Sequence, residues 1–428
     1  MPRSTRLSHL PPRVLGIVQA GGQGSRMDVL TRERAKPALP WGGTHQLIDF
    51  ALSNLANSGI ADVWVSVQYL AGSLDEHLQS GRPWDLDRNR GGYRRLVPEA
   101  GRAPVSGGFS TGNADDLFRT HDEIARHAPD LVVVSSADHV FACDLRPILA
   151  AHLEAGAVTT ILTAEVPKSE ASHKAVVRTC GRDRALADNG VRAREVEALD
   201  YKPERAAGTT VATEIFIYST AALLDTLAAL RRDRDQAGAL DDPADSGLGD
   251  FGERLLPALI ESGPVLAVDI GSYWRDVGRP AAYVQSHRDL VRGRVGLLAD
   301  PAWPITTTTP HPAPARIRDG ARLADCAVAG GCDVAGEVVG SVLGPGVRIE
   351  RGARVVDSVL FAAVHVAAGA VVQTSVIDEQ TRIGRGARVG AHAAGRLTDG
   401  RIALVGRDCM VRPGQQLPAG ARLEPGTR

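Results

Sequence analysis

A repeat in the C-terminal third of the chain constrains its fold more than any other feature. The pattern Ile-x-x-Gly-Ala-x-Leu at residues 317–323 recurs, with conservative changes, at residues 349–355, 366–372, 383–389 and 417–423. These segments start 32, 17, 17 and 34 residues apart. A second motif, Ser-Val followed by Leu or Ile, begins at Ser341, Ser358 and Ser375 with the same 17-residue step.

Within each repeat, apolar residues stand six positions apart. Six residues per flat face and about three faces per coil describe a β-helix, in which each inward aliphatic side chain stacks on its copy in the next coil. The alternative, a loop-rich β-sandwich, would not keep so regular a period. We therefore predict a left-handed parallel β-helix over residues 317–428. It carries no catalytic residues of its own, so we expect a role in assembly and scaffolding.

The preceding part of the chain alternates short apolar runs with amphipathic ones. This alternation predicts an α/β fold, a doubly wound, mainly parallel, Rossmann-like sheet covered on both faces. The expected strands are residues 14–19, 62–68, 131–135, 158–165 and 211–218, and the expected helices are residues 49–57, 114–127, 146–154 and 221–230. Residues 82–107 and 231–249 are predicted loops. We place a catalytic domain at residues 1–295 and a proline-rich linker at residues 296–316.

Composition excludes several classes of protein. A net charge of −1 over 428 residues argues against nucleic-acid binding through a general basic surface. No apolar run approaches membrane-spanning length, and the N-terminus lacks a signal peptide. The five cysteines are scattered, without the close pairs of a zinc site. We therefore expect a cytoplasmic protein with reduced thiols.

A glycine-rich loop closes the first predicted strand. Its sequence is AGGQGSR at residues 20–26, and Lys36 follows ten residues later. Glycines let a polyanion approach the backbone amides, and Arg26 can grip phosphate oxygens. Met27 stands where a dinucleotide fingerprint needs glycine, and no Gly-Lys-Ser/Thr follows as in a Walker A loop. The loop thus predicts a nucleoside triphosphate site; the alternative is a tight turn before a helix.

Two carboxylates and a lysine are candidates for the remaining chemistry. Asp138 follows the predicted strand at residues 131–135, facing the glycine loop, which suits a magnesium ligand. Asp276 is a second carboxylate, and two acids can hold one ion against two phosphates. Lys202 is a candidate for binding a phosphorylated second substrate. Taken singly, an Asx turn or a solvated charge explains each residue equally well.

Together these motifs resemble the sugar nucleotidyltransferase family, most closely its ADP-glucose pyrophosphorylases. The resemblance runs from about residue 14 to about residue 410. Its motifs are AGGxGSR at residues 20–26, RAKPA at 34–38, IDFALSN at 48–54, NSGI at 57–60, QY at 68–69, GxAD at 112–115, ADH at 137–139, KP at 202–203, DFG at 250–252, YWRDVG at 273–278 and WPI at 303–305.

The resemblance implies an enzyme that makes ADP-glucose and pyrophosphate from ATP and glucose 1-phosphate with Mg²⁺, for glycogen or a related glucan. A sugar phosphate oxygen attacks the α-phosphorus in line, and the protein mainly positions the anions and neutralises their charge. The implied catalytic residues are Arg26, Lys36 and Asp138; the nucleotide-binding residues are Ala20, Gly21, Gly22, Gly24, Gln68, Gly112 and Asp115; the sugar-phosphate site is Lys202 with Tyr201, Ala175 and Glu214; and the metal ligands are Asp138 and Asp276.

We expect a homo-oligomer, a tetramer, because the β-helix exposes strand edges.

The sugar-contacting positions depart from the family. Tyr201 replaces Glu, residues 174–176 read Lys-Ala-Val in place of Phe-Gly-Val, and residues 212–214 read Ala-Thr-Glu in place of Ser-Met-Gly. Residues 44–46 lack the lysine that binds an activator in many bacterial members. Three functions stay open: an adenylyltransferase for glucose 1-phosphate, a nucleotidyltransferase for another sugar 1-phosphate, and a non-catalytic regulatory subunit.

Overall fold

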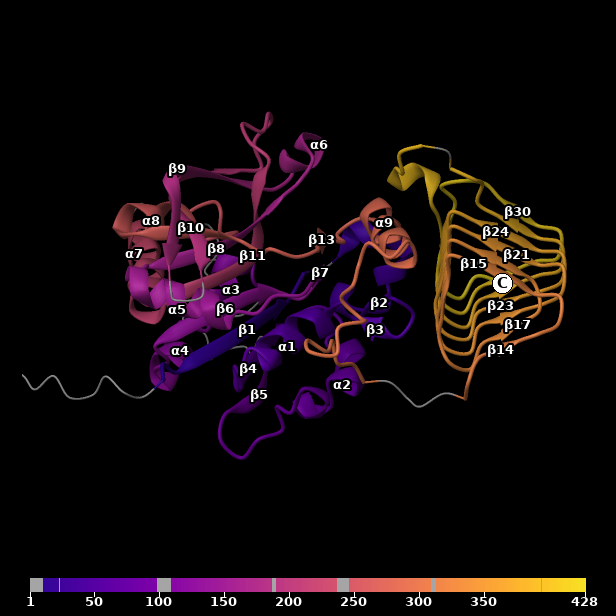
Figure 1. Cartoon of the computed structure of the whole chain (residues 1–428), viewed down its shortest axis with the longest axis horizontal. Helices are drawn as coiled ribbons and strands as arrows, with labels where there is room; N and C mark the ends of the chain where they lie inside the picture. The colour runs from indigo at the N-terminus through magenta and orange to yellow at the C-terminus, as the bar shows by residue number, and fades with distance from the viewer. Residues whose placement is uncertain are drawn as a thin grey trace, which may run out of the picture.

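A computed structural model describes residues 11–22, 24–97, 109–186, 190–236, 246–308, 313–393 and 395–428. The chain forms an α/β part followed by a stack of flat coils, arranged along the long axis of the molecule (Figure 1). Gln23, residues 98–107 and 237–245 of the two predicted loops, and residues 309–312 of the predicted linker lie outside the described residues. Within the described part, no helix is both long and apolar enough to cross a membrane.

A nine-stranded sheet forms the centre of the α/β part, with strand order β5-β4-β1-β6-β11-β8-β12-β10-β9. Its members are β1 (Val14–Ala20), β4 (Asp62–Val67), β5 (Gly92–Leu96), β6 (Leu131–Ser136), β8 (Thr159–Glu165), β9 (Ala175–Leu186), β10 (Val191–Tyr201), β11 (Thr210–Ser219) and β12 (Val265–Asp269). Strands β5, β4, β1 and β6 pair in parallel, as do β8 and β12. Strands β9, β10 and β11 are antiparallel to their neighbours, so the sheet is mixed.

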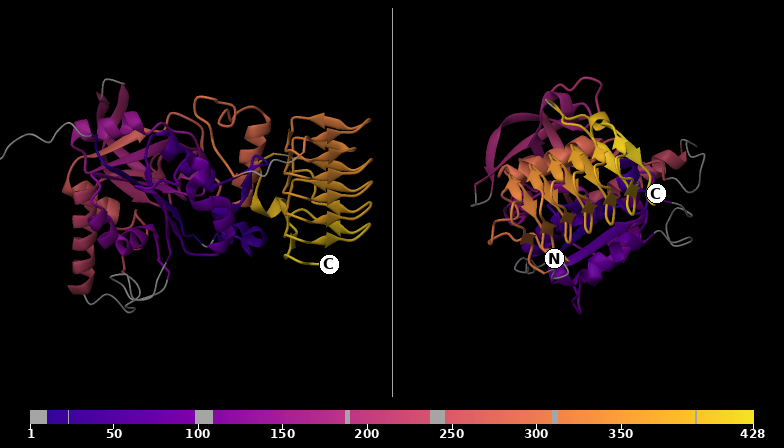
Figure 2. Two further views of the ribbon diagram at one scale, coloured as in Figure 1. Left: turned by 90° about the horizontal axis from the view of Figure 1, so that it is seen from below. Right: turned by 90° about the vertical axis from the view of Figure 1, so that its right-hand side faces the viewer.

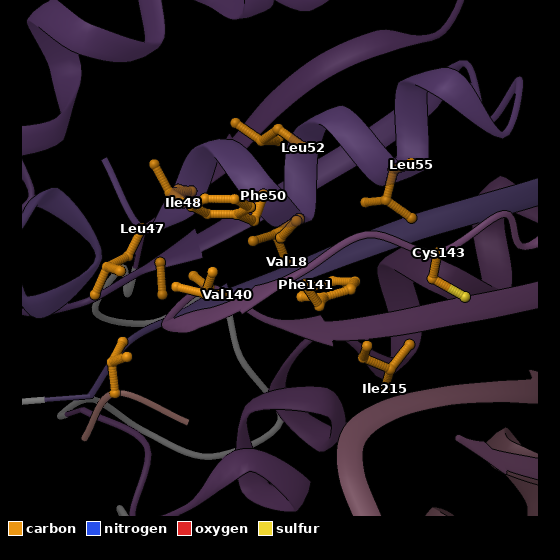
Figure 3. Packing of buried hydrophobic residues seen from close by; sticks show 14 of the residues in the cluster. Val18, Leu47, Ile48, Phe50, Leu52, Leu55, Val140, Phe141, Cys143 and Ile215 are labelled. Carbon is orange, nitrogen blue, oxygen red and sulfur yellow. The ribbon is translucent and has the colours of Figure 1, made fainter. Parts of the chain in front are cut away.

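Helices cover both faces of this sheet. Alternate residues of β1 enter two cores: Val18 packs with one, which includes α1, and Ile17 with the other, which includes α3, α7 and α8. Figure 3 shows Phe50 and Leu55 of α1 on the side of the helix that faces Val18. The helices are α1 (Ile48–Asn57), α2 (Gly72–Leu78), α3 (Asn113–Arg119), α4 (His121–His127), α5 (Arg146–Ala155), α6 (Lys168–Ala171), α7 (Thr220–Gln236), α8 (Leu255–Ser262) and α9 (Pro280–Val291), with short 3₁₀ helices η1 (Ser25–Thr31), η2 (Lys36–Ala38), η3 (Gln79–Trp84) and η4 (Asp399–Arg401). Two covered faces explain why the parallel strands are so apolar.

Several local predictions were wrong. The single helix expected at residues 114–127 is two helices, separated at Thr120, whose Oγ1 donates a hydrogen bond to the Leu117 carbonyl (3.0 Å). Helix α7 continues to residue 236, through the start of a predicted loop, and an Arg231–Asp235 ion pair lies on that extension. The other predicted loop contains edge strand β5. The hairpin β9–β10 was missed because charged residues interrupt its apolar pattern.

Small ladders complete the α/β part near the predicted site. Strand β7 (His139–Phe141) pairs antiparallel with β13 (Trp274–Asp276), and this register places His139 opposite Asp276. Strand β2 (Pro40–Trp41) pairs with β3 (His45–Gln46). The β7–β13 ladder therefore joins two segments that are far apart in the sequence.

The C-terminal repeat forms the predicted parallel β-helix, with three six-stranded sheets as its faces (Figure 2). The first face is β14 (Arg316–Ile317), β17 (Asp333–Val334), β20 (Arg348–Ile349), β23 (His365–Val366), β26 (Arg382–Ile383) and β29 (Met410–Val411); the second is β15 (Arg322–Ala324), β18 (Glu337–Val339), β21 (Arg354–Val356), β24 (Val371–Gln373), β27 (Arg388–Val389) and β30 (Gln416–Leu417); the third is β16 (Ala327–Val328), β19 (Val342–Leu343), β22 (Val359–Leu360), β25 (Ser375–Ile377), β28 (Ala403–Val405) and β31 (Arg422–Leu423). All pairings in it are parallel, and Ile349, Val366 and Ile383 stack as buried copies of one position.

The third face of the β-helix packs against the α/β part. Leu343 and Leu360 point into the coil, whereas Val342 and Val359 belong to the same core as α1. The two parts thus share a hydrophobic core, which fixes the β-helix against the segment that carries the glycine loop.

Candidate active site

The glycine loop lies at the carboxyl end of β1, where active sites of such sheets are found. A Cβ on Gly21 would lie 2.8 Å from the Gln68 amide nitrogen, and one on Gly24 would lie 2.8 Å from the Lys36 Cβ. Gly24 also has a positive φ of 65°, which starts η1. Gly24 is therefore required by close packing and backbone conformation, whereas a side chain at residue 21 would displace the Gln68 amide from its present place.

Most of the predicted site residues surround one cavity of about 740 Å³. They are Ala20, Gly21, Gly22, Arg26, Lys36, Gln68, Gly112, Asp138, Tyr201, Lys202, Glu214 and Asp276. Gly24, Asp115 and Ala175 do not line it. Gly24 shapes the turn, Ala175 is buried at the start of β9, and buried Asp115 accepts hydrogen bonds from Arg119 Nε (2.9 Å) and the Thr111 amide (2.9 Å).

A charged cluster forms the floor of the cavity. The Lys36 ammonium contacts the Asp138 carboxylate and lies 4.0 Å from Asp276 Oδ1. Lys174 Nζ donates to Asp276 Oδ2 at 2.7 Å. His139 is buried on the other side, with Nε2 3.4 Å from Asp138 Oδ1 and 3.9 Å from both Asp276 Oδ1 and Glu214 Oε2. Segments from four regions of the chain thus meet at two aspartates.

These contacts decide the ionisation of the aspartates. Burial by itself would raise the pKa of Asp138, but Lys36 and His139 hold that pKa at about 2. Burial likewise opposes ionisation of Asp276, yet Lys174 and Lys36 hold its pKa well below the usual value. Burial raises the pKa of Glu214, which has no such ammonium contact among the described residues. Asp138 and Asp276 are therefore anionic at neutral pH.

The two aspartates fit a divalent cation. Carboxylate oxygens are the protein ligands that Mg²⁺ prefers, and Mg²⁺ is commonly bound by one or two carboxylates plus substrate phosphates. Asp138 directly precedes β7 and Asp276 ends β13, and these two strands pair side by side, so both carboxylates line the same cavity as the glycine loop. A cation bound there would replace the charge that Lys36 and Lys174 now supply.

Polar residues define one end of the cavity. Gln68 Oε1 accepts a hydrogen bond from the Ser110 amide (2.9 Å). Buried Asp116 accepts hydrogen bonds from Ser66 Oγ (2.6 Å), Gln19 Nε2 (3.0 Å) and Gln68 Nε2 (3.3 Å). Gln19 and Asp116 line the cavity but were not predicted. Asp116 stands beside Asp115 in a predicted helix, where an acidic residue gives no signal of a site, whereas Gln19 directly precedes the glycine loop.

Aromatic residues line an adjoining part of the cavity. Tyr201 Oη donates to Asp250 Oδ2 at 2.5 Å, and Lys202 Nζ lies 3.2 Å from the same oxygen. The Phe251 ring packs against Phe216 (4.8 Å between centroids) and Tyr201 (5.8 Å). Asp250 belongs to the DFG motif but had no predicted role; in the structure it contacts Tyr201 and Lys202, two of the four predicted sugar-site residues. In the sequence, Lys174 stands out only because it differs from the family's Phe. In the structure it forms an ion pair with Asp276.

A cavity at the carboxyl edge of the sheet, with cations and carboxylates beside a glycine loop, defines a nucleotidyltransferase. A family model described as nucleotidyl transferase matches residues 15–293. One described as GlmU-like, C-terminal hexapeptide matches residues 314–402, in agreement with the left-handed β-helix.

Curated relatives narrow the family further. Glucose-1-phosphate adenylyltransferase of Thermomicrobium roseum is 37% identical over 320 residues, which cover 74% of this chain and 69% of the relative. The proteins of the same name from Pseudothermotoga lettingae and Streptomyces avermitilis are each 34% identical over 80% of this chain, and the matches cover 76% and 84% of those relatives. The chain belongs to the glucose-1-phosphate adenylyltransferase family, as its motifs predicted.

Proposed function

We propose that this protein is an adenylyltransferase that joins ATP and glucose 1-phosphate to give ADP-glucose and pyrophosphate, a precursor step for glycogen or a related glucan. The observation that carries the proposal is the single cavity in which the glycine loop, Lys36 and two ionised aspartates lie opposite Lys202. The family relationship supports both substrates.

Different residues of the cavity would bind the two anionic substrates, ATP and the sugar phosphate. The glycine loop, Arg26 and Lys36 would hold the triphosphate, with Gln68 and Gly112 beside the base, and Lys202 would hold the sugar phosphate. A phosphate oxygen of the sugar then attacks the α-phosphorus in line, the new P–O bond forms, and the bond to the β-phosphate oxygen breaks to release pyrophosphate. Such a reaction needs positioning and charge neutralisation rather than covalent catalysis by the protein.

Asp138 and Asp276 would hold the cofactor Mg²⁺, which supplies Lewis-acid neutralisation of phosphate charge when bound. Lys36 contacts Asp138, and its long side chain lines the same cavity as the glycine loop. We infer that Lys36 turns from the carboxylate to the triphosphate when ATP enters. It would then stabilise negative charge that grows on the α-phosphate in the transition state.

A second candidate function changes only the sugar. Asp250 ties up both Tyr201 and Lys202, and Glu214 adds a carboxylate beside the aspartate cluster. A hexose with a different pattern of donors would suit these groups, because buried acceptors left unpaired reduce affinity. The mechanism would stay the same.

We also propose a cytoplasmic homo-oligomer, with a tetramer as the expected size. All five cysteines are free thiols, as suits a reducing compartment. The β-helix ends in strands that pair on one side only, and Ile317 and Met410 near those ends are exposed. Light scattering at micromolar concentration tests the proposal, and a monomer mass would contradict it.

Turnover tests the function directly. The purified protein is mixed with ATP, Mg²⁺ and a panel of sugar 1-phosphates, and pyrophosphate release is measured. We expect glucose 1-phosphate to be the best substrate; a higher kcat/KM for another sugar would establish the second candidate. No turnover with any sugar would instead support a regulatory subunit, which the ionised aspartate cluster argues against.

A further inference from the structure

Strand β11 carries an irregularity that faces the aspartate cluster. On its neighbour β8, Ala212 pairs with Thr163 and Phe216 pairs with Ile161, so the register shifts between these two pairs. Thr213 Oγ1 holds the bulged segment by donating to the Leu162 carbonyl (2.8 Å). Bulges next to active sites re-aim side chains, and this one directs Glu214 into the cavity.

The backbone of Glu214 supports a dedicated role for this side chain. Its φ is 59°, in the left-handed region that disfavours residues with a Cβ. Among the described residues, Glu214 has no lysine or arginine at ion-pairing distance, in contrast to Asp138 and Asp276. Within the described part of the site, the strained conformation therefore presents a carboxylate that no ammonium group contacts directly.

His139 provides a second, independent observation. Its side chain is 2% exposed, and Nδ1 lies 3.0 Å from the Thr213 carbonyl oxygen. A carbonyl can only accept, so Nδ1 carries the hydrogen and Nε2 faces Asp138 and Glu214. A ring N–H donated to a backbone carbonyl is the arrangement that orients a metal-binding histidine. The same bulge thus fixes the imidazole and aims the carboxylate.

The ligand atoms are close enough to share one ion. One ligand atom each from Asp138, His139 and Glu214 lies within 4.8 Å of the other two. Around an octahedral ion with bonds of about 2.1 Å, neighbouring ligand atoms are about 3 Å apart and opposite ones about 4 Å. Small side-chain rotations therefore suffice to bring all three onto one cation.

We propose that Asp138, His139 Nε2 and Glu214 form a divalent-cation site that binds Mn²⁺ more tightly than Mg²⁺. Mg²⁺ favours oxygen ligands and keeps several waters, whereas an imidazole nitrogen favours divalent ions of the first transition series over Mg²⁺. This proposal depends on the proposed function only in taking Asp138 as a metal ligand. It adds His139 and Glu214 as further ligands of the same metal site. Glu214 is thereby a cation ligand rather than only a neighbour of the sugar.

Metal binding without nucleotide tests this assignment. The full-length protein is freed of metal with a chelator and titrated with MnCl₂ or MgCl₂ in a calorimeter, with no ATP and no sugar. We expect Mn²⁺ to bind at least about 10-fold more tightly than Mg²⁺. Glu214→Gln should weaken Mn²⁺ binding at least about 10-fold. The matched control is Glu197→Gln, the same change at an exposed position of β10.

Mn²⁺ binding by Glu214→Gln at unchanged affinity, or no Mn²⁺ binding by the parent protein, would overturn the site. Equal affinities for Mn²⁺ and Mg²⁺ would overturn the role of the His139 nitrogen. If Glu214→Gln does not fold, as circular dichroism would show, Glu214→Gly takes its place, because glycine tolerates this φ. The titration needs no turnover, so an inactive protein that binds Mn²⁺ through Glu214 would contradict the proposed function alone.

Discussion

At the residue scale, Lys36 and Lys174 each hold one aspartate of the site in its ionised form. This arrangement keeps two half-buried carboxylates close together, where they would otherwise repel each other and take up protons. Each ammonium group is carried on a long, flexible side chain that can turn toward an incoming phosphate. Under the proposed function, substrate phosphates would exchange with these same lysine–aspartate contacts.

Replacing Asp138 tests the metal and phosphate chemistry. Asp138→Asn keeps the shape of the side chain but removes its charge, which weakens both the cation site and the hold on Lys36. We expect kcat to fall at least about 100-fold with every sugar phosphate, as for other losses of transition-state charge stabilisation. Pyrophosphate release measures it, with Asp144→Asn, which removes the exposed Arg146 pair, as the control. Retention of most of the activity would contradict the role of Asp138.

The conformation of Glu214 predicts a gain in stability on substitution. Glu214→Gly removes the strain of a positive φ, which should stabilise the folded protein by about 1–2 kcal/mol. Glycine also gives the unfolded chain more conformational entropy, which should lower stability by about 0.5–1 kcal/mol. We expect the variant to be more stable to urea by about 0.5–1 kcal/mol. Glu195→Gly, at an exposed position of β10 that pairs in register with Cys180, should instead destabilise. A Glu214→Gly variant that unfolds at lower urea would show that contacts of Glu214 outweigh the strain.

At the scale of elements, buried serines join successive coils of the β-helix. Ser341, Ser358 and Ser375 occupy one position in three coils and are at most 2% exposed. The Ser358 amide donates to Ser341 Oγ (3.0 Å), and the Ser375 amide donates to Ser358 Oγ (3.2 Å). Each hydroxyl donates in turn to the carbonyl two residues earlier, so the ladder satisfies polar groups that the coil buries.

Removing the middle hydroxyl of this ladder should destabilise the β-helix. Ser358→Ala leaves the buried Ser375 amide without its partner, at about 1–3 kcal/mol, whereas the Val356 carbonyl keeps the Thr374 amide as a donor. Urea unfolding followed by circular dichroism measures the loss. Ser262→Ala, at the exposed end of α8, is the control and should change stability by less than about 0.5 kcal/mol. Equal stability of both variants would mean that water replaces the lost contacts.

At the scale of the whole molecule, the segment between Gly24 and Lys36 is anchored on the β-helix. Buried Arg34 Nη2 lies 2.8 Å from Asp378 Oδ1 and 3.3 Å from Glu379 Oε2, and its guanidinium lies over the Phe361 ring. Arg32 pairs with Glu424 nearby, in an exposed position. Because Arg34 is two residues from Lys36, the β-helix helps to position Lys36, the proposed catalytic lysine.

Breaking the buried pair should therefore affect both stability and turnover. Asp378→Asn leaves Arg34 with one carboxylate partner, so we expect a loss of about 3 kcal/mol, at the lower end for buried pairs because Glu379 stays. We also expect lower kcat, measured as pyrophosphate release. Glu424→Gln removes the exposed pair and should cost less than about 1 kcal/mol. If Asp378→Asn loses stability but keeps its kcat, the contact between Arg34 and the β-helix does not contribute to turnover.

Periodic features of the sequence were sufficient to predict much of this protein. The 17-residue step fixed the β-helix, because each coil can bury its aliphatic side chains only by stacking on an identical one. Apolar runs likewise predicted five strands of the sheet, since strands covered on both faces leave little room for polar residues. The glycine loop and its companions pointed to the right family because chemistry with phosphates needs those residue types.

Only the tertiary structure decided what the charged residues do. Sequence patterns could not show that Lys174 holds Asp276, that Asp250 joins Tyr201 to Lys202, or that Glu214 reaches the aspartates from a bulge. Such contacts join positions far apart in the chain, and a bulge changes a side chain's direction without any change in composition. A sequence states which ionisable groups exist, whereas their charges and partners depend on distances and burial that arise only when the chain is folded.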